Sequence, residues 1–172
     1  MLLAGFARIP ATVASRLVIV GGIARHIQQY KAQAESLGIS GRVEFSGPRP
    51  ITDMPGLMAS ADILVSPRTQ GANTPMKIYS YMASGKSIVA TDLPTHTQVL
   101  DTSMAVLCKP EPAAMAEAIM QLIHDPRLRE KLAGKARQTV QEKYSLPVFR
   151  REVDALYGWM QQAGTRKGVH GS

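Results

Sequence analysis

The chain has 172 residues, of which 45% are hydrophobic and 19% charged, so it suits one domain with a buried core and is not a disordered chain. Its formal net charge of +7 should attract phosphate groups, whether of nucleic acid, anionic lipid or a nucleotide. The single cysteine, Cys108, excludes a disulfide scaffold and a cysteine-based metal cluster.

Five short apolar runs alternate with segments of helical periodicity along the chain. Such runs are typical of strands buried on both faces, as the strands of a parallel sheet are. We therefore predict an α/β fold in three layers, with a mostly parallel sheet between helices. The predicted strands cover residues 16–21, 43–46, 63–66, 87–91 and 105–108.

The predicted helices begin at recognisable signals. Thr74 with Pro75, and Asp125 with Pro126, suit an N-cap followed by a first helical position. Residues 161–172 include a stretch without apolar periodicity, and we expect them to form a disordered tail after a domain that ends at residue 160. The predicted helices cover residues 2–9, 26–37, 53–58, 75–84 and 94–98, two segments beginning at 112 and 126, and residues 145–160.

Three loops follow the carboxyl ends of predicted strands, and these ends of a parallel sheet are where ligands bind. The loops are residues 21–22, 46–50 and 68–75, and we expect them to line one crevice. A helix beginning after the third loop would point free backbone N–H groups and a partial positive charge into that crevice.

The third loop carries further features that suit an anion. Gly71 would let a ligand approach the backbone closely, and Arg68 and Lys77 would add full positive charges. This combination predicts a cradle for a diphosphate. An ordinary capped helix after an ordinary loop fits the spacing as well. The residues alone leave both interpretations open, the diphosphate cradle and the ordinary helix start.

Other candidate groups carry weaker signals. The pair Gly21–Gly22 follows a strand but lacks the G-x-G-x-x-G dinucleotide pattern. His96 lies in a polar run after a strand, where a helix-start cap explains it about as well as a ligand role. The acidic residues lie scattered at turns, so we predict no metal site. Basic residues between 127 and 151 alternate with glutamates, which indicates solvated helix faces rather than a nucleic-acid-binding surface.

The apolar pattern argues against a membrane-spanning chain. No run approaches the roughly 20 apolar residues that cross a bilayer. The first ten residues also lack the charged start of a signal peptide. We therefore expect a cytoplasmic protein.

The sequences of these segments, and their order along the chain, resemble the C-terminal, donor-binding half of the retaining glycosyltransferases of group 1, also called family 4. These enzymes have the GT-B fold of two Rossmann-like domains. The resemblance covers most of residues 17–157 and is most specific between residues 66 and 100. The matching stretches are LVIVGG, GRVEFSGPRP, MASADILVSPR, NTPMKIYSYMASGKSIVATDLPTHTQVL and DPRLREKLAGKARQTVQEKYS.

The resemblance implies roles for particular residues. In this family, backbone N–H groups around the start of the "YMASGK" helix hold the donor's diphosphate, and a preceding strand end packs against the nucleotide base. It assigns no catalytic residue, no metal and no cofactor besides the nucleoside diphosphate sugar, which is the donor substrate. The substrate-binding residues that we predict are Gly22, Ser46, Gly47, Pro48, Arg68, Gly71, Asn73, Thr74, Met76, Lys77 and Ser80.

The chain departs from the family pattern in two ways. The family's two glutamates, eight residues apart, correspond to Ala72 and Ser80, and a serine hydroxyl binds more weakly than a carboxylate. The family's domain also opens with a strand and a loop bearing an Arg and a Lys, which have no counterpart here. We therefore expect a fold that lacks its first strand and has an open slot with unpaired strand edges.

Two hypotheses follow. In the first, residues 1–160 are the nucleotide-sugar-binding domain of a glycosyltransferase, which needs a missing N-terminal acceptor domain in cis or in trans and does not transfer sugar alone. In the second, the same half-fold is a non-catalytic binding or scaffold protein. An anionic membrane surface is a further candidate partner of the basic chain, and nucleic acid is not expected as one. An excised piece, a truncated gene product and one subunit of a split enzyme all fit the sequence.

Overall fold

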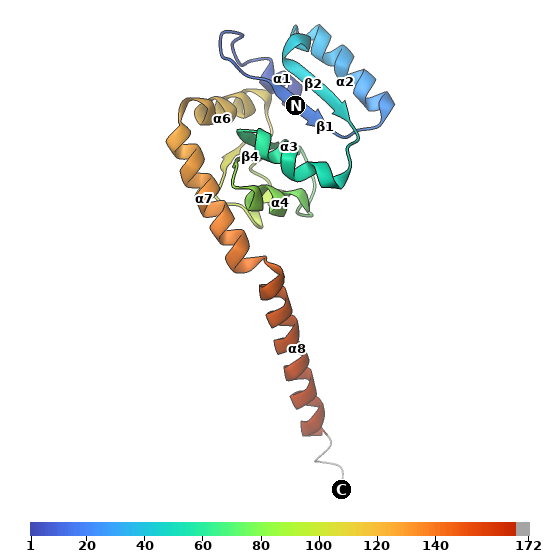
Figure 1. The fold of residues 1–172 in the computed structure, drawn as a ribbon, viewed down its shortest axis with the longest axis vertical. Coiled ribbons are helices and arrows are strands. Elements are labelled where there is room, and N and C mark those ends of the chain that lie inside the picture. Colours follow the sequence, from blue (N-terminus) through green and yellow to red (C-terminus); the bar gives the residue numbers. More distant parts are fainter. Residues whose placement is uncertain (168–172) are drawn as a thin grey trace.

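The computed structural model describes residues 1–167, with side chains described through residue 161, and the strands in it pair in parallel. The strands are β1 (Leu17–Val20), β2 (Val43–Gly47), β3 (Ile63–Ser66), β4 (Ser87–Thr91) and β5 (Val106–Cys108). The strands β1 and β2 lie side by side in one sheet (Figure 1), and the other sheet has the order β3-β4-β5. The five predicted strands, their parallel pairing and the α/β class are confirmed.

Helices connect the strands and close the chain. They are α1 (Leu2–Phe6), α2 (Ala24–Ser36), α3 (Met54–Ser60), α4 (Lys77–Ser84), α5 (Pro94–Thr97), α6 (Pro112–His124), α7 (Pro126–Lys143) and α8 (Leu146–Lys167). Gly85 ends α4 with a φ of 72°, a left-handed conformation that favours glycine. Asp125 caps α7 as predicted, because its carboxylate accepts a hydrogen bond from the N–H of Leu128 at 2.9 Å.

Helices cover both faces of the three-stranded sheet and give the predicted three layers. Val89 of β4 packs in one cluster with side chains of α1 and α6. Ile88 and Ala90 pack in a second cluster with side chains of α4 and α7. Successive side chains of a strand point to opposite faces, so these two clusters lie on the two sides of the sheet. All five residues of β4 are buried, which makes this strand the centre of the domain.

The sheet is interrupted between β1 and β3, as expected for a fold without its first strand. Within the part of the chain that the structure describes, no strand pairs with the second edge of β1 or with that of β3. Val18 and Val20 are 46% and 38% exposed, whereas Leu17 and Ile19 pack against the core. The prediction of burial on both faces is therefore wrong for β1, because only one of its faces is covered.

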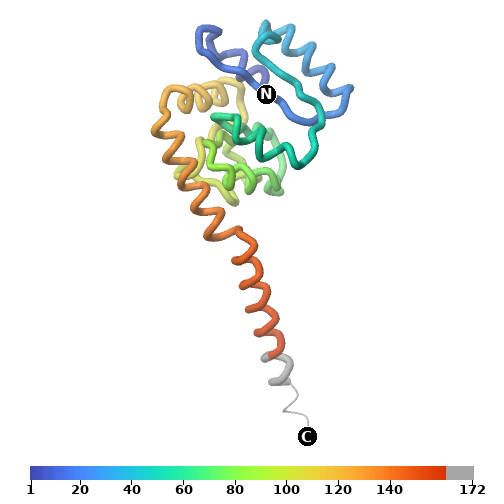
Figure 2. The backbone as a smooth tube through the Cα atoms, in the orientation of Figure 1, coloured from blue at the N-terminus to red at the C-terminus, as the bar shows by residue number. Residues whose placement is uncertain are grey.

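The last helix, α8, leads away from the rest of the chain (Figures 1 and 2). It carries exposed large apolar side chains, including Phe149, Leu156 and Trp159. The predicted end of this helix at Met160 is wrong, because α8 continues to Lys167. Each residue added to an existing helix gains one backbone hydrogen bond, so a helix can extend through residues that have no apolar periodicity.

The prediction of a disordered tail is therefore wrong for residues 161–167, which are helical. Residues 168–172 of that predicted tail lie outside the described residues. Over the described part of the chain, none of the helices combines the length and the hydropathy that a bilayer crossing requires.

Candidate functional site

The loop between β3 and α4 carries most of the predicted site residues. We call residues 68–77 the donor loop. It leaves the sheet just after the fully buried Ser66. Gly71 has a φ of 120°, and a Cβ atom there would lie 3.2 Å from Nη1 of Arg68. Both the backbone conformation and the nearby guanidinium group therefore favour glycine at this position.

The helix after the loop begins two residues later than predicted. Thr74 does not cap it; the residue before the helix is Met76, and no side chain caps the first turn. The hydroxyl of Thr74 instead donates to Oε1 of Gln98 at 3.2 Å. The predicted N-cap is therefore wrong, because the Thr74 hydroxyl bonds to the side chain of Gln98 and not to the first turn of the helix.

Side chains at α5 hold the donor loop by its carbonyl groups. Nε2 of Gln98 donates to the carbonyl of Ala72 at 2.8 Å. The hydroxyl of Thr95 donates to the carbonyl of Asn73 at 2.7 Å. Nη1 of Arg68 donates to that same carbonyl at 3.1 Å and to the Thr95 hydroxyl at 3.2 Å. These bonds fix the peptide planes on both sides of Asn73.

The donor loop also presents several backbone N–H groups. Within residues 1–167, the N–H groups of Asn73, Thr74, Met76 and Lys77 find no acceptor. Pro75, between them, has no N–H to donate. Unpaired N–H groups just before a helix are the donors from which phosphate oxygens accept hydrogen bonds.

Two cations lie close together on this loop. Burial lowers the pKa of Lys77, and the neighbouring charge of Arg68 lowers it further. Nζ of Lys77 also lies 5.6 Å from the centre of the Tyr81 ring. In the described residues, neither cation has an acidic partner, since the ion pair there joins Arg16 to Glu44. A bound anion would relieve the repulsion between Arg68 and Lys77.

His96 is a buried anchor of α5 rather than a ligand. Its Nδ1 lies 2.9 Å from the carbonyl of Thr91 and its Nε2 lies 2.8 Å from the hydroxyl of Ser66. The neutral Nδ1–H form satisfies both, with Nδ1 donating and Nε2 accepting. Burial is the main reason that the pKa of His96 lies below its usual value. Ser66 and His96 are 0% exposed, so this hydroxyl–imidazole pair has no access to substrate.

The remaining loop candidates form a second group. It consists of Gly22, Ser46, Gly47 and Pro48. The N–H of Gly21 donates to the carbonyl of Gly47 at 2.8 Å and so joins the ends of β1 and β2. Gly22 has a φ of 92°, and a Cβ atom there would lie 3.3 Å from Cγ1 of Ile27. The tight turn itself thus favours glycine.

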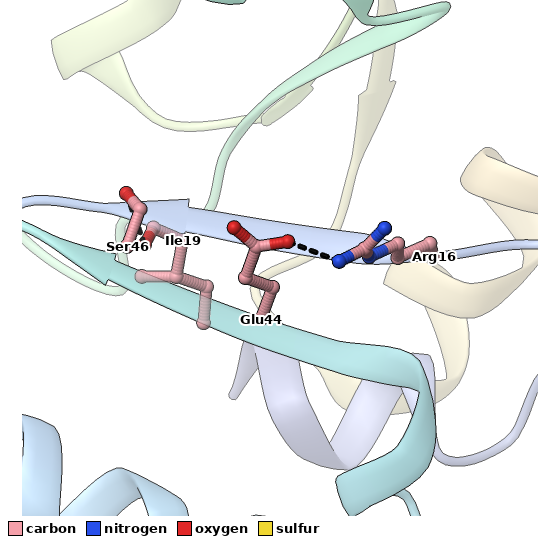
Figure 3. A network of polar contacts seen from close by, with 4 residues as sticks. All are labelled: Arg16, Ile19, Glu44 and Ser46. Carbon is pink, nitrogen blue, oxygen red and sulfur yellow. Dashed lines mark hydrogen bonds and ion pairs between the residues drawn. The ribbon is translucent and has the colours of Figure 1, made fainter.

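Figure 3 shows the polar contacts between β1 and β2. Ser46 directs its hydroxyl to the carbonyl of Ile19 at 3.4 Å, and Arg16 pairs with Glu44 further back along the strands. The hydroxyl of Ser46 is therefore engaged within the sheet. Among the described residues, no hydrogen bond or ion pair joins this group to the donor loop, so a single crevice lined by both stays a prediction.

Ser80 follows the donor loop on the next turn of α4. It is exposed on α4 and lines an open depression with Tyr79 and with Tyr144 at the end of α7. Thr95 and Gln98 were not predicted as site residues, although they belong to the polar run that contains His96. A polar run directly after a buried strand was the signal that could have identified them.

The arrangement suits anion binding more than bond-making chemistry. It offers fixed N–H donors and two cations beside a close-approach glycine. Within the described residues, no three His, Cys, Asp or Glu side chains gather to hold a metal ion.

Comparison with known sequences identifies the family to which the chain belongs. A family model described as glycosyl transferases group 1 matches residues 1–125. A phosphatidyl-myo-inositol mannosyltransferase of Mycolicibacterium smegmatis is 26% identical over 136 residues, which are 78% of this chain and 35% of that protein. A protein of the same name from Mycobacterium leprae is 25% identical, over 83% of this chain and 38% of its own length.

Solved structures share the fold. Anabaena Alr3699/HepE in complex with UDP-glucose superposes with a TM-score of 0.80 at 23% identity, over 91% of this chain and 44% of that one. The C-terminal domain of a glycosyl transferase group 1 protein (LpcC) from Francisella tularensis superposes with a TM-score of 0.72 at 19% identity, over 84% of this chain and 77% of that one.

The chain thus spans less than half the length of the curated relatives, yet it covers most of an isolated C-terminal domain. With a family model that matches 1–125, the chain belongs to the glycosyl transferases of group 1, and its fold is that of the C-terminal half of a GT-B enzyme.

Proposed function

We propose that residues 1–160 bind the nucleotide-sugar donor of an enzyme that transfers a sugar from a nucleoside diphosphate to an acceptor hydroxyl, with retained configuration. One observation carries this proposal: at the carboxyl end of β3, the donor loop brings together N–H groups without an acceptor and two cations without an acidic partner among the described residues. A solved protein of the same fold, described in complex with UDP-glucose, supports it.

Each group of residues has a proposed part. The N–H groups of the donor loop bind the diphosphate, and Arg68 and Lys77 offset its charge. Gly22 and the β2 end at 46–48 contact the nucleotide base. Ser80 offers the ribose one neutral hydrogen bond. Stabilising the leaving diphosphate and positioning the donor are the main contributions that such a domain makes to transfer.

Transfer also requires an acceptor-binding domain, which we propose is supplied in cis or in trans. The coverage of less than half of the curated relatives supports a second domain. The unpaired edges of β1 and β3 and the exposed apolar side chains of α8 are consistent with a surface that another domain covers.

A scaffold role on the same half-fold is the second candidate function. It is favoured by Ala72 and Ser80, which carry no carboxylate at the positions where the resemblance implies glutamates. A cytoplasmic protein associated peripherally with an anionic membrane fits the net charge of +7. Co-sedimentation with anionic vesicles, compared with neutral ones, would detect that association.

Thermal unfolding with uridine diphosphate tests the proposed function. We expect a dissociation constant on the order of millimolar, so about 10 mM ligand should raise the free energy of unfolding by about 1.4 kcal/mol. Uridine at the same concentration should stabilise the chain much less, because it offers no phosphate to the donor loop. Equal stabilisation by the two ligands would contradict a diphosphate site.

A further inference from the structure

We infer that Thr95 and Gln98 are positioning residues, which aim the backbone N–H groups of the donor loop at the donor's diphosphate. This inference rests on the proposed function and adds to it two residues that lie outside the loop. Their side chains bond the loop's carbonyl oxygens, at 2.7 Å for Thr95 and 2.8 Å for Gln98.

Because the peptide bond is planar, a hydrogen bond that fixes the direction of a carbonyl group also fixes the direction of the next N–H group. In a planar trans peptide, the C=O of one residue and the N–H of the next point in opposite directions. The carbonyl of Ala72 faces Gln98, so the N–H of Asn73 points away from α5. The carbonyl of Asn73 faces Thr95, so the N–H of Thr74 also points away from α5.

The two side chains that hold the loop, Thr95 and Gln98, are themselves held in place. Thr95 is 0% exposed, and its neighbour His96 bonds to Ser66 at the end of β3 and to Thr91 at the end of β4. Gln98 is held at both ends of its amide, since Oε1 accepts from the Thr74 hydroxyl while Nε2 donates to the loop. The direction of the N–H groups is therefore set by the sheet through α5.

Stability alone does not explain the bond from Gln98. That hydrogen bond is exposed, so the carbonyl of Ala72 could bond to water without a penalty for burial. What the bonds from Thr95 and Gln98 change is the orientation of the peptide planes. Donors that are oriented before the ligand arrives lose less conformational entropy on binding, and their affinity for the ligand rises accordingly.

Three substitutions in the full 172-residue chain test the inference, with uridine diphosphate as the probe. Thr95→Val keeps the shape but removes the donor, Thr95→Ser restores it, and Gln98→Leu removes both bonds of that amide. We expect Thr95→Val and Gln98→Leu each to weaken binding about 5-fold, and Thr95→Ser to bind within about 2-fold of the unsubstituted chain. Gln33→Leu, at an exposed position on α2, is the matched control.

Two further measurements separate aiming from folding. The midpoint of thermal unfolding of Gln98→Leu should match that of Gln33→Leu, and affinity for uridine should be unchanged in every variant. If the unsubstituted chain binds uridine diphosphate and Gln98→Leu and Thr95→Val bind it equally well, the inference is wrong while the proposed function survives. If the unsubstituted chain does not bind it, the proposed function is wrong and the inference fails with it.

Discussion

His96→Ala should lower the free energy of unfolding by about 3 kcal/mol, a large part of the roughly 5–15 kcal/mol that stabilises a typical domain. The substitution removes the partner of two fully buried hydroxyl groups, those of Ser66 and Thr91, and leaves a cavity between β3, β4 and α5. Thermal unfolding should show a midpoint about 10 °C lower.

His26→Ala is the matched control, because this histidine is exposed on α2 and should change stability by about 0.5 kcal/mol or less. The pH dependence gives an independent check. Burial lowers the pKa of His96 in the folded chain, so its contribution to stability is complete above the unfolded value of about 6.5 and is lost as pH falls through the folded value. His96→Ala should flatten this acid dependence, and an unchanged slope would contradict a buried neutral imidazole.

Lys77→Ala should weaken the binding of uridine diphosphate about 10-fold, which corresponds to the loss of one charge-assisted contact. The ammonium group lies near Arg68, where a diphosphate would offset both charges. The affinity should be measured from the shifts of backbone amide resonances during a titration, because we expect dissociation constants on the order of millimolar.

Arg127→Ala is the control for Lys77→Ala. Arg127 is also a cation, but it is exposed on α7. It should leave the affinity within about 2-fold of the unsubstituted chain. Equal losses for the two variants would show that the chain attracts the ligand only through its net charge.

The sequence predicted the strands and the placement of the donor loop because both depend on local pattern. Apolar runs fix the five strands, and the order of strands and helices fixes which loops lie at carboxyl ends. Glycine also marks two turns, because Gly71 and Gly85 each have a positive φ, which glycine adopts more easily than other residues.

The side-chain hydrogen bonds that hold the donor loop could not be predicted in the same way. Thr95 and Gln98 lie 22 and 26 residues after the carbonyl groups that they bond, so no local spacing connects them. The same long-range contact explains the wrong N-cap, since the Thr74 hydroxyl bonds to Gln98 instead of the helix. The exposed face of β1 was missed because an apolar run does not reveal which of its neighbours is absent.

The most direct test of the donor-loop site is a titration of the full chain with uridine diphosphate, followed by the shifts of its backbone amide resonances. We expect the largest shifts to centre on residues 71–77, with a second group at 46–49. Shifts spread over the basic helices between residues 127 and 151 would contradict it, because they would show only nonspecific attraction of an anion to a basic surface.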